Sequence, residues 1–194
     1  PILEPILERH HNPPPPQATS AQHMGTLVPD GAPHQGVVLK TRPLDNADFT
    51  AVCARLSEQT GLVVVLDQVT DPQNVGAIIR SSVAFGAQAL VTTDRNAPFE
   101  TGALSRAAVG GVDRLPWARV TNLADALNAL GETGAVLMGL DGSNEAEDIF
   151  VPPKQRRVLV LGAECGGQWK VLWSVCSDAS NTAVRYDGKS GCHP

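Results

Sequence analysis

The sequence predicts an α/β fold in which helices cover both faces of a parallel β-sheet. Between residues 44 and 164, apolar runs of strand length alternate with segments whose apolar residues recur at helical spacing. Residues 62–66 form a continuous apolar run, which is typical of a strand covered on both faces. Repeated strand–helix–strand order favours parallel pairing, and ligands of such sheets bind at the carboxyl ends of the strands.

Five strands are predicted from apolar runs bounded by turn-forming residues. Pro116 restricts the third run to the edge of the sheet, because proline cannot donate a ladder hydrogen bond. The runs cover residues 62–66, 89–93, 114–120, 135–140 and 157–162.

A helix is predicted after the first strand. Asn74 follows Pro72 by two residues and is expected to be the N-cap, because asparagine caps helices well. The apolar residues behind it have helical spacing, and Gly86 is expected to end the helix.

Two further helices are predicted downstream. A short helix around residues 103–109 is expected to end at Gly110. The other is capped by Thr121 or Asn122 and is expected to stop at Gly131.

The two ends of the chain differ from its centre in composition. Residues 1–43 hold nine of the fifteen prolines and are interpreted as an arm or linker. Residues 44–164 form the predicted α/β domain. Residues 165–194 hold three of the four cysteines and show no clean helical or strand period, so they are an atypical tail.

Composition excludes several classes of protein. Fifteen Lys and Arg against twenty Asp and Glu give a net charge of −5, which excludes a polycationic nucleic-acid wrapper. Any RNA contact then needs a local basic patch, with candidates at Arg95, Arg106, Arg114, Arg156 and Arg157.

No apolar run is long enough to span a bilayer, and the first residues lack a secretory pattern, so we expect a cytoplasmic protein without membrane contact. Its four cysteines form no C-x-x-C pair. The spacing of Cys165, Cys176, Cys192 and His193 fits no usual zinc pattern, so we expect free thiols and no metal.

The first candidate site is the turn and helix start from Asp67 to Ser81. Gly76 permits close approach of another backbone. Asn74 and Arg80 bring polar chemistry to this segment, although a helix cap and a solvated helix arginine are their ordinary roles.

The second candidate site is the glycine-rich turn after the last predicted strand, from Leu161 to Gly167. Such a turn can cradle a nucleotide-like ligand with backbone N–H groups, but it is neither a Walker loop nor a G-x-G-x-x-G motif. The strand end at Gly139–Gly142 is a third candidate, for which an ordinary Asp-Gly turn is the alternative.

Together these residues resemble the SpoU (TrmH-type) family of RNA ribose 2′-O-methyltransferases. The pattern D-x-V-x-D-P-x-N-x-G-A-x-x-R-S from Asp67 to Ser81 is similar to the family's first motif, and Val158–Glu164 is similar to the start of its second. His34-Gln35-Gly36-Val37 resembles the linker of the members that act on ribosomal RNA, in particular the guanosine-2′-O type specific for 23S rRNA.

The resemblance implies a SPOUT-type fold with a C-terminal trefoil knot. It implies S-adenosyl-L-methionine as the methyl donor, a ribose 2′-hydroxyl of RNA as the acceptor, and a homodimer whose sites draw on both subunits. The implied substrate is 23S rRNA rather than tRNA. Asn74 and Arg80 match the catalytic positions of the family. The implied donor-binding residues are Gly139, Leu140, Leu161, Gly162 and Glu164.

The sequence departs from the family after Glu164. Cys165 replaces a glycine of the second motif, and the third motif, S-L-N-V-S, is missing. One explanation is a frame-shifted tail, because codons for Asp187–His193 can be read one base later as M-E-S-L-D-V. The chain is then either an active methyltransferase, or a catalytically inactive RNA-binding relative or truncated product. An unrelated nucleotide-binding domain is the third alternative.

Overall fold

The computed structural model describes residues 15–29, 32–40, 42–95, 97–141, 155–162 and 184–185. The chain divides into two compact units, Pro1–Arg42 and Pro43–Pro194. Apart from Val184–Arg185, the predicted tail of residues 165–194 lies outside the described residues, and so does the predicted knot.

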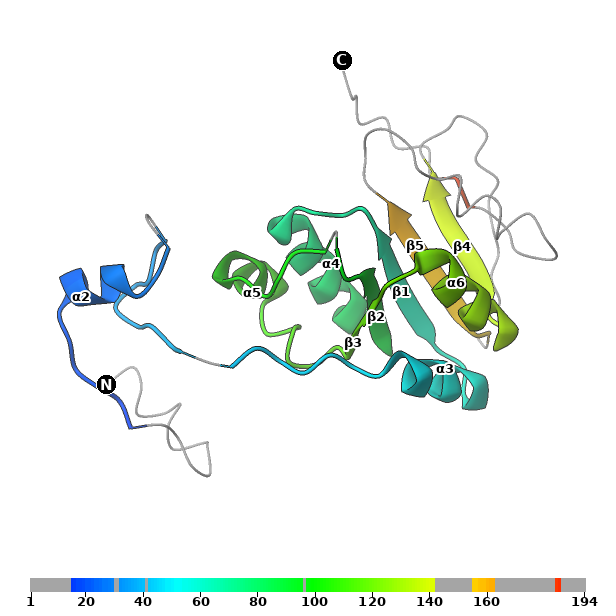
Figure 1. The fold of residues 1–194 in the computed structure, drawn as a ribbon, viewed down its shortest axis with the longest axis horizontal. Helices are drawn as coiled ribbons and strands as arrows, with labels where there is room; N and C mark the ends of the chain where they lie inside the picture. Colours follow the sequence, from blue (N-terminus) through cyan, green and yellow to red (C-terminus); the bar gives the residue numbers. More distant parts are fainter. Residues whose placement is uncertain are drawn as a thin grey trace, which may run out of the picture. The chain divides into compact units, whose positions relative to one another are not determined.

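A parallel sheet forms the centre of the second unit (Figure 1). Its strands lie side by side in the order β3-β2-β1-β5-β4-β6, and every neighbouring pair is parallel. The strands are β1 (Leu62–Asp67), β2 (Ala89–Thr93), β3 (Trp117–Val120), β4 (Val136–Asp141), β5 (Arg157–Gly162) and β6 (Val184–Arg185).

Helices pack on both faces of this sheet, which confirms the predicted fold class (Figure 1). One apolar cluster joins the sheet to α3 and α6, and the other joins it to α4 and α5. The helices are α3 (Phe49–Glu58), α4 (Pro72–Ala84), α5 (Gly102–Ala108) and α6 (Leu123–Glu132).

Strand β1 explains why both layers are needed. Val63 and Val65 belong to the cluster under α3 and α6, whereas Val64 and Leu66 belong to the cluster under α4 and α5. All four side chains are at most 2% exposed. The continuous apolar run therefore marks a strand that is buried on both faces, as predicted.

The other predicted strands are also present. The bounds of β2 and β5 agree with the predicted ranges, and β4 begins and ends one residue later than predicted. β3 is an edge strand, as Pro116 indicated, but it is shorter than the predicted range because it begins only at Trp117.

The predicted N-cap of α4 is wrong. Asp71 is the cap, and its carboxylate accepts a hydrogen bond from the Gln73 N–H at 3.1 Å. Pro72 follows at the first helical position, where its missing N–H costs nothing and its fixed φ suits the helix. Asn74 is therefore the third residue of α4 and is free of a capping role.

The predicted end of α6 is also wrong. Asn122 caps the helix, with its side-chain oxygen accepting from the Ala124 N–H at 3.0 Å. The helix runs through Gly131 to Glu132, and the left-handed residue that follows it is Gly134, with φ +77°. The helix therefore ends just before Gly134 and not at Gly131.

The first unit contains a short helix, α2 (Ala21–Thr26), which the sequence analysis did not predict and which buries no residue. His34-Gln35-Gly36-Val37 forms a tight turn, in which the Val37 N–H donates to the His34 carbonyl at 2.9 Å. Gln35 and Gly36 both have positive φ, at 48° and 81°, which explains the glycine. Across both units, no helix within the described residues has the length and apolar character needed to cross a bilayer.

Gly76 lets α4 and α5 pack closely. A Cβ atom there would lie 2.6 Å from the Leu104 carbonyl oxygen. We expect Gly76→Ala to lower the free energy of unfolding by about 1–3 kcal/mol, because backbone must move to accommodate it.

Gly131→Ala is the matched control, because the new Cβ would meet only Leu137 Cδ1 at ordinary contact distance, 3.6 Å. It should raise stability by about 0.5–1 kcal/mol through helix propensity. Urea denaturation of both variants checks the pair, and equal shifts in the same direction would contradict the packing argument.

Candidate functional site

The candidate site lies where the order of the strands across the sheet reverses. The chain leaves β1 toward β2 and β3 on one side, and β5 and β4 occupy the other side. In the register of β1 and β5, Leu66 lies beside Leu161 and Asp67 lies beside Gly162. A crevice opens outside the carboxyl ends of parallel strands at such a reversal, which makes this edge the expected ligand site.

Four of the five predicted donor-binding residues lie on the two neighbouring strands β4 and β5. Leu161 and Gly162 end β5, and Gly139 pairs with Val160 on the adjacent strand. Leu140 follows on β4 and pairs with Val184 of β6. The fifth residue, Glu164, lies outside the described residues.

Two glycines leave the backbone of these strand ends without side chains. Gly139 is buried and pairs with Val160 inside the sheet, whereas Gly162 is half-buried at the last residue of β5, so a ligand at this edge would meet backbone without a side chain at Gly162. This arrangement suits a flat nucleoside held by backbone contacts, and it offers no cage of carboxylates or imidazoles. No group of three metal-binding side chains occurs among the described residues.

The two predicted catalytic residues project from α4, which begins directly after the β1 turn. Asn74 and Arg80 are both exposed. Six residues of helix separate them, which is about 9 Å along the axis and about 120° around it. Within the described part of the chain, neither side chain has a hydrogen-bond or ion-pair partner.

The turn between β1 and α4 carries backbone strain and a perturbed carboxyl group. Gln68 has φ 59°, the left-handed region that a residue with a side chain rarely adopts. Burial raises the pKa of the Asp67 carboxyl, and the hydrogen bond from the Gln68 side chain opposes part of that rise. Strain and a raised pKa at the same strand end are features that cluster at functional sites.

The five arginines predicted as a basic patch do not lie together. Arg95 follows the carboxyl end of β2, and Arg106 lies on α5. Arg114, Arg156 and Arg157 instead precede or begin strands, at the opposite edge of the sheet.

Arg156 has a structural role that the sequence did not reveal. Its guanidinium donates to the backbone carbonyls of Thr133 and Ser57, which lie at the ends of α6 and α3. It therefore ties together the two helices on that face of the sheet.

Arg119, on edge strand β3, was not predicted from the sequence. Its guanidinium lies over the Trp117 ring, 4.5 Å from the ring centroid, and over the Phe99 ring, 5.6 Å from that centroid. It also donates to the Pro98 carbonyl at 2.9 Å. Alternation along a strand places residues 117 and 119 on one face, and this is the only signal in the sequence that could have linked them.

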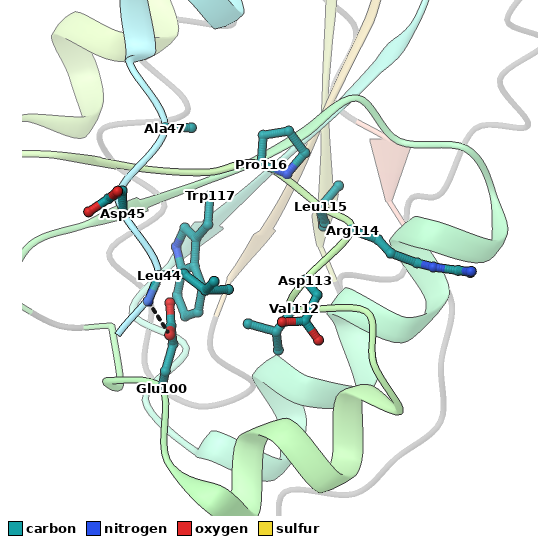
Figure 2. A pocket seen from close by; sticks show the side chains of 10 residues that line it. All are labelled: Leu44, Asp45, Ala47, Glu100, Val112, Asp113, Arg114, Leu115, Pro116 and Trp117. Carbon is teal, nitrogen blue, oxygen red and sulfur yellow. Dashed lines mark hydrogen bonds between the residues drawn. The ribbon is translucent and has the colours of Figure 1, made fainter. Parts of the chain in front are cut away.

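A pocket of about 290 Å³ lies beside the start of β3 (Figure 2). Trp117 forms one wall, and Glu100 accepts a hydrogen bond from the Leu44 N–H at 3.1 Å across it. None of the predicted catalytic or donor-binding residues lines this pocket, although Arg114, a candidate for the basic patch, does. It is a product of packing residues 44–47 against the sheet edge and not the predicted donor site.

Residues 61–179 match the family described as the SpoU rRNA Methylase family. The match covers more than half of the chain, and its first half contains the β1 turn, Asn74 and Arg80. The chain belongs to this family.

Curated relatives agree with the family match. Over 154 residues the chain is 35% identical to the 23S rRNA (guanosine-2′-O-)-methyltransferase RlmB of Vibrio cholerae. This alignment covers 77% of this chain and 61% of the relative. Over 147 residues it is 30% identical to a Staphylococcus aureus protein named as a TrmH family tRNA/rRNA methyltransferase, covering 75% and 59%. The chain spans about three-fifths of the length of these relatives.

Solved structures support the fold. The SpoU methyltransferase AviRb from Streptomyces viridochromogenes, solved in complex with the cofactor AdoMet, superposes with a TM-score of 0.62. The superposition covers 78% of this chain and 60% of AviRb at 22% sequence identity. The parallel sheet with helices on both faces is therefore the fold of SpoU methyltransferases.

The raised pKa of Asp67 predicts how stability depends on pH. The folded protein holds this proton more tightly than the unfolded chain, so stability falls as pH rises from the unfolded pKa, near 3.8, through the higher folded pKa. Asp67→Asn removes this loss. Its free energy of unfolding, relative to the parent chain, should therefore increase between about pH 4 and pH 7.

Urea denaturation across this pH range measures the effect, with Asp113→Asn as a control at an exposed position. A parent-to-variant difference that stays constant with pH for Asp67→Asn would show that burial does not perturb this carboxyl.

Proposed function

We propose that this chain transfers a methyl group from S-adenosyl-L-methionine to a ribose 2′-hydroxyl of RNA. The observation that carries the proposal is the capping of α4 by Asp71, which leaves Asn74 free of a capping role. Asn74 and Arg80 then stand exposed, on the helix that begins at the reversal of strand order.

The residues of β4 and β5 fit the donor. Gly162 lacks a side chain where a nucleoside would meet the backbone, and Leu161 beside it is half-buried and apolar. Gly139 and Leu140, on the neighbouring strand β4, are assigned to the same donor on the family resemblance. Glu164 follows two residues after the end of β5 and is assigned to the same donor on the family resemblance. S-adenosyl-L-methionine, when bound, supplies a methyl carbon already activated by its sulfonium, so most of the remaining task is positioning.

Arg80 is assigned to hold and polarise the acceptor. Its guanidinium can bind a backbone phosphate through two parallel hydrogen bonds and stabilise negative charge at the attacking hydroxyl. It does not serve as a base, because guanidinium stays protonated at neutral pH. The substrate phosphate or a water molecule would take the proton as the hydroxyl oxygen bonds to the methyl carbon. The bond between that carbon and the donor sulfur would break at the same time, and S-adenosyl-L-homocysteine would leave.

Asn74 is assigned to orient the ribose or Arg80. One helix separates the two side chains by about 9 Å and 120°, which is a poor arrangement for gripping a single hydroxyl. A homodimer resolves this, because a site can take Asn74 from one protomer and Arg80 from its partner. The homodimer is therefore part of the proposal.

Ribosomal RNA of the large subunit is the proposed substrate, in preference to tRNA. One support is the 35% identity to RlmB. The other is the resemblance of residues His34–Val37 to the linker of the family members that act on ribosomal RNA. That substrate places the proposed activity in the cytoplasm.

A catalytically inactive RNA-binding relative is the competing proposal. It is favoured by Cys165 in place of a family glycine and by the missing S-L-N-V-S motif. A frame-shifted tail would account for both the missing motif and an intact first half. The nucleotide sequence of the gene decides this question, because codons that do not yield the motif in another frame show that the tail is native.

Donor binding separates these two proposals. Isothermal titration calorimetry of the whole chain with S-adenosyl-L-methionine should give saturable heat in the active case. Absence of heat at millimolar donor would leave the chain without its methyl donor and would favour the inactive relative.

Arg80→Ala should lower kcat/KM for methyl transfer to ribosomal RNA by roughly 100- to 1,000-fold, as loss of one charge-stabilising donor does elsewhere. Arg80→Lys should retain part of the activity, because the charge remains while the two-pronged geometry is lost. Tritiated methyl transfer from the donor to RNA measures both.

Arg55→Ala is the matched control, since Arg55 is an exposed helix arginine of α3, on the other face of the sheet. Equal activity of Arg80→Ala and Arg55→Ala would remove Arg80 from the mechanism.

A further inference from the structure

Phe99 is an exposed aromatic residue in the connection between β2 and α5, with 78% of its surface accessible. Single exposed apolar side chains are common on proteins and need no function by themselves. Phe99 differs from such residues because a cation lies against its ring. The Arg119 guanidinium is 5.6 Å from the ring centroid.

The cation beneath Phe99 is held firmly in place. Trp117 stacks on the same guanidinium at 4.5 Å, and the Pro98 carbonyl accepts one of its hydrogen bonds. The other terminal nitrogen, Nη1, is buried and has no hydrogen-bond partner among the described residues. This arrangement directs the charge of Arg119 toward aromatic faces rather than into solvent.

The backbone on both sides of Phe99 is anchored as well. Arg119 binds the carbonyl of the preceding residue, Pro98, and the carboxylate of the following residue, Glu100, accepts the Leu44 N–H at 3.1 Å. Thr101 then caps α5 by accepting from the Leu104 N–H. The ring is therefore presented from a fixed segment, which reduces the entropy lost when a ligand stacks on it.

The location suits the proposed substrate. Phe99 lies against Arg119 of β3. Strand β3 is about 10 Å from β1, because two strand spacings separate them. Arg95, which is exposed, follows β2 at the carboxyl edge and supplies positive charge between the two places. A single-stranded RNA held at the β1 turn reaches Phe99 with a nucleotide close to the target.

We propose that Phe99 is a stacking platform for an unpaired nucleobase of the RNA substrate, backed by the guanidinium of Arg119. The inference rests on the proposed function for its choice of RNA as ligand. Aromatic side chains recognise single-stranded RNA by stacking, and this contact tolerates any base because every base has a π face.

Phe85 provides the matched control. It is 80% exposed, but it lies at the C-terminal end of α4, just before the amino end of β2. Within the described residues no cation lies over its ring. The two phenylalanines thus share exposure and differ in location and in their support.

The test measures binding of a fluorescein-labelled twelve-residue oligoadenylate to the whole chain by fluorescence anisotropy at low salt. Phe99→Ala should weaken binding by roughly 5- to 100-fold, the range expected for loss of one stacked base. Phe99→Trp should bind like the parent chain, and its new indole should lose fluorescence when RNA is added. Phe85→Ala should bind like the parent chain.

Three results would each overturn the platform. Phe99→Ala could bind like the parent chain, Phe99→Ala and Phe85→Ala could lose equal affinity, or the parent chain could fail to bind the oligonucleotide. The proposed function fails differently, through loss of S-adenosyl-L-methionine binding in the parent chain. A parent chain that binds donor and methylates RNA, with an unchanged KM for RNA in Phe99→Ala, would refute the platform alone.

Discussion

The parallel pairing of β1 with β5 is the constraint on which the candidate site depends. These strands are distant in sequence, yet their register aligns Leu66 with Leu161 and Asp67 with Gly162. The pairing brings the exit of the first strand, where α4 begins, beside the exit of the last long strand. Both faces of β1 are buried, so a shift of one residue would move Val63–Leu66 into the wrong apolar clusters. Packing of the core thereby determines which residues meet at the carboxyl edge.

A small difference in capping links this fold to chemistry. Asp71 caps α4 and Pro72 is its first residue, so the Asn74 side chain does not cap the helix. The positive φ of Gln68 and the raised pKa of Asp67 mark the same turn as a place where folding tolerates strain and a half-buried carboxyl group. Such features cost stability, and they are consistent with a turn shaped for a ligand as well as for packing. At the sheet edge, the single guanidinium of Arg119 contacts Trp117, Phe99 and the Pro98 carbonyl.

The sequence predicted the elements that depend on local pattern. β2 and β5 have the predicted bounds because apolar runs flanked by breakers define buried strands. It failed where two residues compete for one role: Asp71 against Asn74 at a cap, and Gly131 against Gly134 at a helix end. Pro72 at the first helical position decides the cap in favour of Asp71, and it can be read from the sequence. The positive φ of Gly134 decides the helix end, and it can be known only from the structure. The contacts of Arg119 and Arg156 join residues far apart in sequence, so no local pattern could show them.

Hydrogen–deuterium exchange of the whole chain, with and without S-adenosyl-L-methionine, shows whether the paired ends of β1 and β5 form the donor site. If the carboxyl ends of β1, β4 and β5 form the donor site, added donor should slow exchange in peptides covering residues 66–76, 138–141 and 160–164. Peptides covering the β3 pocket, at residues 112–117, should be unchanged. Protection confined to the β3 pocket, or no protection anywhere, would contradict the assignment of this edge as the site of methyl transfer.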